Sequence, residues 1–111
     1  MSNMLPIVFA PFPFLDKVGT KNRPLLVLSE SILGNTKVYI TAYITTKKSN
    51  GLDEFDILLQ PSATNGLECE SVIKLNKLGS VDISTITNEI GHIPEELTLL
   101  IKSKLKGLFN L

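Results

Sequence analysis

The sequence predicts a single mainly-β domain with short helical additions and one α-helix near its end. Short apolar runs rich in branched residues alternate with glycine- and proline-containing turns over most of the chain, which is typical of strands. Residues 94–108 instead carry apolar side chains at helical spacing. With 111 residues the chain can bury one core but not two, so residues 1–111 are expected to form one domain.

Composition narrows the class of protein. Hydrophobic residues make up 43% and charged residues 20% of the chain, as in globular proteins. No stretch approaches the roughly 20 apolar residues of a membrane helix, and the start has no basic leader, so we expect a cytoplasmic protein without a membrane partner. Cys69 is the single cysteine and lacks a zinc-ligand pattern around it. We therefore expect no disulfide, no metal and no cofactor.

The first half of the chain predicts three strands. Leu5–Phe9 is apolar, and the prolines in and after it favour a strand start or a sheet edge. A glycine-containing loop follows, and Pro24–Ser29 is short and apolar enough for a buried strand. Gly34-Asn35 is a turn signal that closes a hairpin onto the next strand.

That next strand, Lys37–Thr45, alternates strictly. One face is expected to be core and consists of Val38, Ile40, Ala42 and Ile44. The other face consists of Tyr39, Thr41, Tyr43 and Thr45. Tyrosine and threonine can stack, form hydrogen bonds and tolerate water, so this second face is the candidate functional surface.

The second half predicts shorter strands and the helix. Phe55–Gln60 and Ser71–Leu75 have the composition of strands, whereas residues 80–91 fit a strand or a short helix equally. Pro94 suits a first helical position, with acidic residues following it and lysines near the helix end. The predicted apolar stripe is Leu97, Leu100, Ile101, Leu105 and Leu108.

Positive charge is concentrated in one part of the chain. The net charge is zero, but residues 17–48 contain six basic residues against Glu30 alone, a local charge of +5. The six are Lys17, Lys21, Arg23, Lys37, Lys47 and Lys48. This asymmetry fits a local anion site, and it also fits a solvated charged face.

Arg23 is the only arginine in the chain, and it stands where a basic loop meets a predicted strand. A guanidinium presents a planar fork that matches two phosphate oxygens, whereas lysine offers a point charge. The alternative is a surface ion pair with Asp16 or Glu30. The sequence contains no glycine-rich nucleotide loop and no nucleophile elbow, and its lone histidine, His92, makes an imidazole-based triad improbable.

The order of these segments resembles the PemK/MazF family of toxin endoribonucleases. The segments that carry the resemblance are "IVFAPFPFLDKVGTKNRPLLVLS", "VYITAYITT", "LLQPSATNGLECESVIKLNKLGSV" and "IGHIPEELTLLIKSKL". The resemblance runs from about residue 7 to the end of the chain. It implies a small SH3-like barrel with short helical additions and a C-terminal helix. It also implies a homodimer, metal-independent cleavage of single-stranded RNA, and an antitoxin partner that occupies the RNA groove.

By the same resemblance, the catalytic arginine falls on Arg23 of "NRP" and the catalytic threonine on Thr45 of "YIT". We expect further contacts with RNA from Lys17, Lys21, Tyr43, Thr46, Lys47 and Lys48. The lysines would hold the phosphate backbone and Tyr43 would stack on a base, although packing in the core or in a dimer accounts for the tyrosine equally well. The family usually begins its first strand with Gly-Asp, where this chain has Leu5-Pro6. No general base can be carried over, because the loop before Arg23 lacks the acidic residue of some members.

Two other readings of the sequence remain. A gyrase poison of the CcdB type keeps the same barrel and helix but acts by binding a protein, and it does not need the Arg23–Thr45 pair. An inactive barrel that only binds an antitoxin is the third possibility. The presence of both catalytic-type residues favours the ribonuclease.

Overall fold

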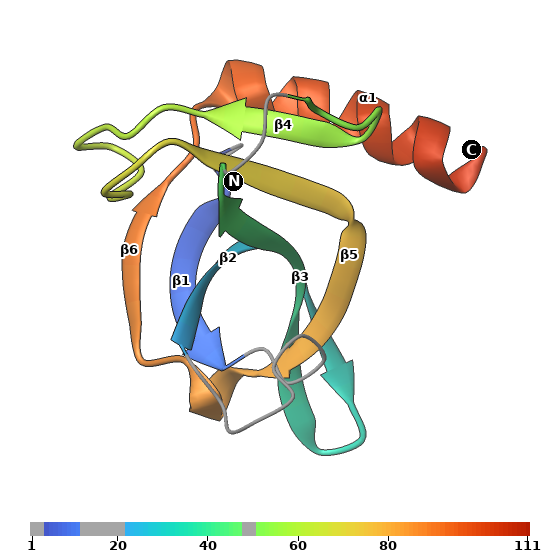
Figure 1. Ribbon diagram of the computed structural model, residues 1–111. Coiled ribbons are helices and arrows are strands. Elements are labelled where there is room, and N and C mark those ends of the chain that lie inside the picture. The colour runs from blue at the N-terminus through green and yellow to red at the C-terminus, as the bar shows by residue number, and fades with distance from the viewer. Residues whose placement is uncertain (1–3, 12–21, 48–50) are drawn as a thin grey trace.

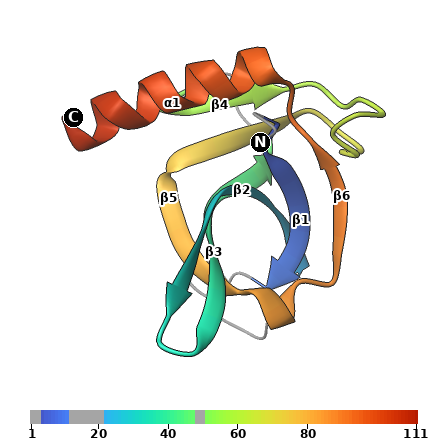
Figure 2. The same cartoon turned by 180° about the vertical axis from the view of Figure 1, so that it is seen from behind.

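The computed structural model describes residues 4–11, 22–47 and 51–111. One six-stranded sheet, with strand order β4-β5-β3-β2-β1-β6, curls round on itself, and the helix α1 lies across one end beside β4 (Figures 1 and 2). All pairings of neighbouring strands are antiparallel. The elements are β1 (Pro6–Pro11), β2 (Asn22–Leu33), β3 (Thr36–Thr46), β4 (Asp56–Leu59), β5 (Ser71–Asp82), η1 (Ile83–Thr85), β6 (Asn88–His92) and α1 (Glu95–Phe109).

The predicted mainly-β class with a terminal helix is confirmed, but the sheet is not a closed barrel. Within the described residues, the edge strands β4 and β6 do not pair with each other. The loop between β4 and β5 spans part of the gap instead, because the His92 amide donates to the Thr64 carbonyl at 3.0 Å. Two glycines allow this approach: a Cβ on Gly91 would lie 2.4 Å from the Thr64 oxygen, and Gly66, at φ +70°, abuts the Ile90 carbonyl.

The strands follow the prediction in position, and all exceed it in length except β4, which is shorter than the predicted Phe55–Gln60. Of the two places expected for the prolines, a strand start and a sheet edge, the first is found: Pro6 begins β1 and Pro11 ends it, while β1 itself lies between β2 and β6 as an interior strand. Gly34, at φ 65°, turns β2 into β3 as expected. The ambiguous residues 80–91 contain the end of β5, the short η1 and β6.

β5 is far longer than the predicted Ser71–Leu75 because it turns a corner (Figure 1). Ala42 of β3 pairs with Leu78, but the next residue, Tyr43, pairs with Lys74. Residues 75–77 of β5 therefore have no counterpart in β3. Such a bulge bends its strand. On one side of the bend residues 71–74 pair with both β3 and β4, and on the other side residues 78–82 pair with β3.

The curled sheet buries both faces of β3 along its middle. One core cluster includes Ala42 and Ile44, together with Ile101 of α1. A second cluster contains Val8, Ala10, Leu25, Val27, Tyr43 and Val81. The expectation that the tyrosine and threonine face is wet is therefore wrong in the middle of the strand, where Thr41 is fully buried and donates to the Gly79 carbonyl at 3.0 Å.

Helix α1 follows the prediction except at one residue of the predicted apolar stripe, Leu100. Leu100 is 46% exposed, whereas Thr98 is fully buried and returns its hydroxyl hydrogen bond to the Pro94 carbonyl at 3.2 Å. Pro94 is the N-cap rather than the first helical residue. Lys104 ties the helix to the loop before β4 by donating to the Glu54 carbonyl at 2.8 Å. None of the helices in the described residues is long and apolar enough to span a membrane.

Candidate active site

The two residues predicted to be catalytic lie on neighbouring, paired strands, Arg23 near the start of β2 and Thr45 near the end of β3. The β2–β3 pairing includes Leu26 with Ala42 and Leu25 with Tyr43. Continuing that register by two residues sets Arg23, at the start of β2, opposite Thr45, near the end of β3. Side chains directly opposite in an antiparallel pair project from the same face, with Cβ atoms about 4.5–5.5 Å apart. The extended register therefore sets the stem of Arg23 and the hydroxyl of Thr45 on one face of the sheet.

The neighbours of this pair are apolar and buried. Ala10 of β1 pairs with Arg23, and Val72 of β5 pairs with Thr45, which extends the same row across the sheet. Ala10 is fully buried and Val72 nearly so. Arg23 is itself half-buried, and its Nε is shielded from solvent. Because a charge beside low-dielectric neighbours is poorly screened, this arginine attracts an anion more strongly than a surface lysine does.

A hollow of about 190 Å³ opens beside Thr45. Its lining includes three of the predicted site residues, Thr45, Thr46 and Lys47. Lys47 is fixed at the end of the strand because its amide donates to the Glu70 carbonyl at 3.0 Å. Thr46 is exposed, and its Oγ1 lies 3.7 Å from Cys69 Sγ. Strand alternation turns Thr46 away from the face that Arg23 and Thr45 share.

The same hollow contains an ion pair that the sequence analysis missed. Asp56 as a whole residue is 7% exposed, and its Oδ2 accepts hydrogen bonds from Lys74 Nζ and from the Asp53 amide, each at 2.9 Å. Lys74 Nζ also lies 3.4 Å from Asp53 Oδ2. These carboxylates raise the pKa of Lys74, chiefly through the Asp56 hydrogen bond. Each charge stands alone in an apolar strand, "FDILL" and "SVIKL", and this is the signal that would have suggested a buried pair.

Comparison with known proteins now decides the family. The model of the PemK-like, MazF-like toxins of type II toxin-antitoxin systems matches residues 5–109. The chain belongs to this toxin family. Its fold is similar to the Mycobacterium tuberculosis toxin MazF-mt6, with a TM-score of 0.72 and 23% identity over 96% of this chain and 97% of that one.

A second similar structure is an endoribonuclease in complex with its cognate antitoxin from a mycobacterial species. It has a TM-score of 0.65 and 12% identity over 100% of this chain and 95% of that one. No curated protein sequence matches the toxin. The family assignment supports the predicted enzyme class.

The predicted base-stacking role of Tyr43 finds little support in the toxin's geometry. Its side chain is 8% exposed and packs in the second core cluster with Leu25. Lys77 Nζ lies 5.9 Å from the ring centroid, over the ring. The ring therefore offers little free surface to a base, and packing is the reading that its burial favours.

The basic residues of the toxin are only partly described. Lys17, Lys21 and Lys48 lie outside the described residues, as does Asp16, the nearer candidate partner for Arg23. Glu30, the other candidate partner, pairs with Lys37 at 3.0 Å in the β2–β3 hairpin and raises the pKa of that lysine.

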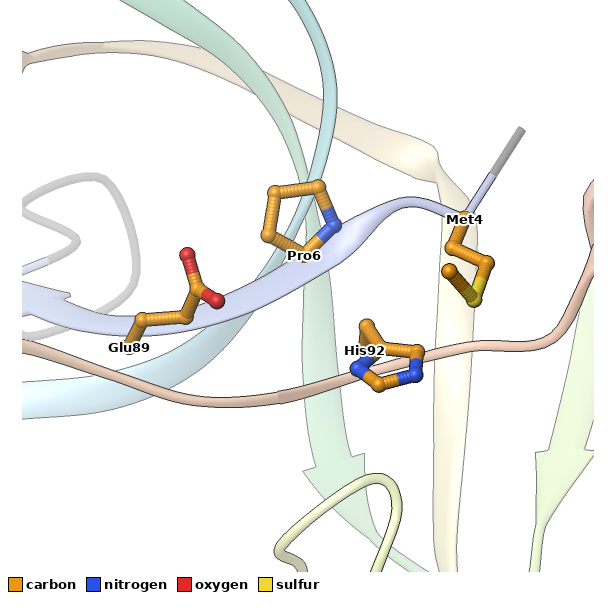
Figure 3. A pocket seen from close by; sticks show the side chains of 4 residues that line it. All are labelled: Met4, Pro6, Glu89 and His92. Carbon is orange, nitrogen blue, oxygen red and sulfur yellow. The ribbon is translucent and has the colours of Figure 1, made fainter. Parts of the chain in front are cut away.

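The toxin's single histidine, His92, lies away from the Arg23–Thr45 pair. His92 lines an open hollow of about 270 Å³ with Met4, Pro6 and Glu89 (Figure 3). It pairs with Pro6, whereas Arg23 pairs with Ala10 near the other end of β1. The imidazole is therefore separated from the Arg23–Thr45 pair by the length of a strand, in line with the expectation of chemistry without histidine.

Proposed function

We propose that the chain is a toxin endoribonuclease that cleaves single-stranded RNA without a metal ion, in the cytoplasm. The observation that supports the proposal is the antiparallel β2–β3 register, whose continuation by two residues sets Arg23 opposite Thr45 on one face of the sheet. A cation and a hydroxyl side by side match the two needs of a phosphate undergoing in-line attack. They supply positive charge and a directed hydrogen bond.

In this mechanism the ribose 2′-oxygen loses its proton and forms a bond to the adjacent phosphorus, and the bond from phosphorus to the 5′-oxygen breaks. The products are a 2′,3′-cyclic phosphate and a 5′-hydroxyl, which takes up the proton. The phosphorane between them carries more negative charge than the starting diester. Arg23 and Thr45 stabilise that additional charge, so their interactions are stronger in the transition state than in the ground state.

The guanidinium acts as an electrostatic stabiliser rather than as an acid. An arginine pKa above about 12 leaves little driving force for proton transfer near neutral pH. Lys47, in the hollow beside Thr45, is placed to contact the phosphate backbone, a contribution independent of sequence and weakened by salt.

The test is cleavage of a defined single-stranded RNA in EDTA, with the fragment ends identified. Wild type is expected to give discrete fragments ending in cyclic phosphate, and Arg23→Ala and Thr45→Val are each expected to slow cleavage on the order of 10²–10³-fold. Lys102→Ala, which removes an exposed charge on α1, is the matched control. Folded wild type that leaves diverse RNAs intact would argue instead for a gyrase-binding toxin or an inactive barrel.

We also propose a homodimer and an antitoxin partner. The proposal of protein partners is supported by large apolar side chains that are exposed at two places. They are Ile32 and Leu33 at the hairpin tip, and Leu99, Leu100 and Phe109 on α1. Clusters of this kind on a soluble surface mark interaction sites. Light scattering of the purified toxin tests the dimer, and co-purification with the protein encoded beside it tests the antitoxin.

A further inference from the structure

A second hollow, of about 210 Å³, lies at the strand ends that carry the Arg23–Thr45 pair. Pro24, which directly follows Arg23 on β2, lines it from one side. Thr46, which directly follows Thr45 on β3, lines it from the other side. Since successive residues of a strand project from opposite faces, the hollow lies on the reverse of the face that holds the pair. An RNA chain whose phosphate is held by the pair reaches this hollow by passing round the ends of the two strands.

The walls of the hollow are apolar and only partly covered. They consist of Phe9, Pro24, Leu67 and Ile90, each of which is half-buried. Phe9 and Pro24 are paired across β1 and β2, so an aromatic ring and a proline ring form one wall. A concave site lined mainly by apolar and aromatic side chains, with a few polar groups, is typical of a ligand pocket.

Hydrogen bonds within the β4–β5 loop hold the wall that contains Leu67. Asn65 is 6% exposed, and its Oδ1 accepts from the amides of Ser62 and Leu67 at 3.1 and 3.0 Å. The close approach of Gly66 to the Ile90 carbonyl joins this wall to β6. The hollow is therefore built into the fold, and a ligand that enters it does not have to order the loop first.

The size and the rim of the hollow limit what can occupy it. A cavity of about 150 Å³ admits benzene, whereas drug-sized ligands need about 300–1,000 Å³. The rim carries three exposed polar side chains, those of Thr46, Glu68 and Cys69. Because the Glu68 carboxylate repels a phosphate, the hollow suits a neutral group. A nucleobase is neutral and flat, and it has an apolar face for the walls and a polar edge for the rim.

We propose that this hollow binds the base of one of the two nucleotides that flank the scissile phosphate; the inference rests on the ribonuclease function proposed above. The base packs on Phe9 and Pro24, and its polar edge faces Thr46 and Glu68. Every base has an apolar face and an N–H donor, so the hollow contributes to binding without selecting one base. A seated base fixes the adjoining phosphate at the reaction centre, as in-line attack requires.

Cys69 reports directly on occupancy, because it is the single cysteine of the chain, is exposed and lines the hollow. The ligand is a single-stranded RNA with 2′-deoxyribose at the cleaved nucleotide, which removes the attacking hydroxyl and leaves a stable complex. Alkylation of Cys69 by iodoacetamide is followed by mass spectrometry. At ten times its dissociation constant, this RNA is expected to slow alkylation about tenfold. At equal occupancy, the same RNA with an abasic nucleotide at one flanking position is expected to leave Cys69 reactive.

Cleavage tests the same contact during the reaction. With wild type, an abasic nucleotide at that flanking position is expected to slow cleavage by about 5- to 150-fold, the scale of one base packed on an aromatic side chain. Cys69→Phe fills the hollow from its exposed rim and is expected to slow cleavage of the intact RNA by a similar factor. Combining the variant with the abasic RNA is expected to add little, because both remove one contact. Ser103→Phe, which places the same ring on the exposed surface of α1, is the matched control and should cleave as wild type.

Three results would overturn the inference and leave the ribonuclease in place. They are alkylation that the RNA does not slow, alkylation slowed equally by intact and abasic RNA, and additive effects of Cys69→Phe and the abasic nucleotide. Protection of Cys69 by the protein encoded beside the toxin, but not by RNA, would assign the hollow to the antitoxin instead. No cleavage by wild type on any RNA would remove the ribonuclease and this inference together.

Discussion

Replacing Gly91 by alanine is expected to open the seam between the β4–β5 loop and β6. An added Cβ would lie 2.4 Å from the Thr64 oxygen and 2.5 and 2.6 Å from the Asn65 carbonyl carbon and oxygen. All three are backbone atoms, so no side-chain rotation relieves the clash. The loop has to move away from β6 by most of an ångström to restore ordinary contact.

The cost can be worked from the contacts that this movement disturbs. Overpacking of a tight site costs about 1–3 kcal/mol of the free energy of unfolding. The His92 amide to Thr64 carbonyl hydrogen bond, 3.0 Å long, is lost with it, at about another 1 kcal/mol. For a domain of this size each kcal/mol lowers the melting temperature by about 4–8 °C, so a total of about 2–4 kcal/mol gives an expected fall of about 8–32 °C.

Thermal unfolding followed by circular dichroism measures this fall. Gly51→Ala is the control, because a Cβ at Gly51 has nothing within 4 Å, and we expect it to change the melting temperature by no more than a few degrees. A Gly91→Ala protein that melts within a few degrees of wild type would refute the close approach and the idea that the loop closes the sheet.

Three further predictions follow from the site and the core. Lys74→Met leaves a buried carboxylate without its cation and should lower the free energy of unfolding by about 1–3 kcal/mol at neutral pH. Because folding raises the pKa of Lys74, the stabilisation by its charge is complete below about pH 10.4 and disappears as the pH rises through the folded-state pKa. The melting temperatures of wild type and variant should therefore converge in strong alkali. Arg23→Lys keeps the charge but loses the fork, and it should cleave RNA more slowly than Thr45→Ser, which keeps the hydroxyl, in the EDTA gel assay. Ile101→Ala, at a fully buried position, should cost about 2–5 kcal/mol in urea unfolding, and Leu100→Ala, at a largely exposed one, under about 1 kcal/mol.

Much of the fold could be predicted because its local signals agree with its tertiary structure. The alternation of Lys37–Thr45 and the Gly34-Asn35 turn predicted a hairpin that the structure contains. What alternation cannot tell is whether the second face meets water or another part of the same sheet. For this reason alternation leaves Tyr43 open between base stacking and packing, and the curl of the sheet buries it.

The corner in β5 could not be predicted for a related reason. An unpaired bulge changes the phase of inward and outward residues within one strand, so a period-two pattern breaks although the strand continues. The run "SVIKL" was therefore predicted to end at Leu75, while the strand continues to Asp82.

Only part of the candidate site could be predicted from the sequence. Residue chemistry, strand phase and the family resemblance point to Arg23 and Thr45, and the β2–β3 register, continued by two residues, sets them opposite each other. Asp56 and Lys74 were passed over because they are separated in sequence and each is unremarkable alone. Only the β4–β5 pairing, which depends on the whole fold, makes them neighbours.

The pairing of β1 with β6 has a consequence for the making of this protein. Ile7 meets Gly91 across the sheet, so strands from opposite ends of the chain must find each other before the core is complete. Until β6 and α1 have been synthesised, one edge of β1 has no strand to cover it, and Ile93 and Ile101 are missing from the main core cluster. Contacts of such long range slow folding, and a nascent chain acquires its completed sheet only late in translation.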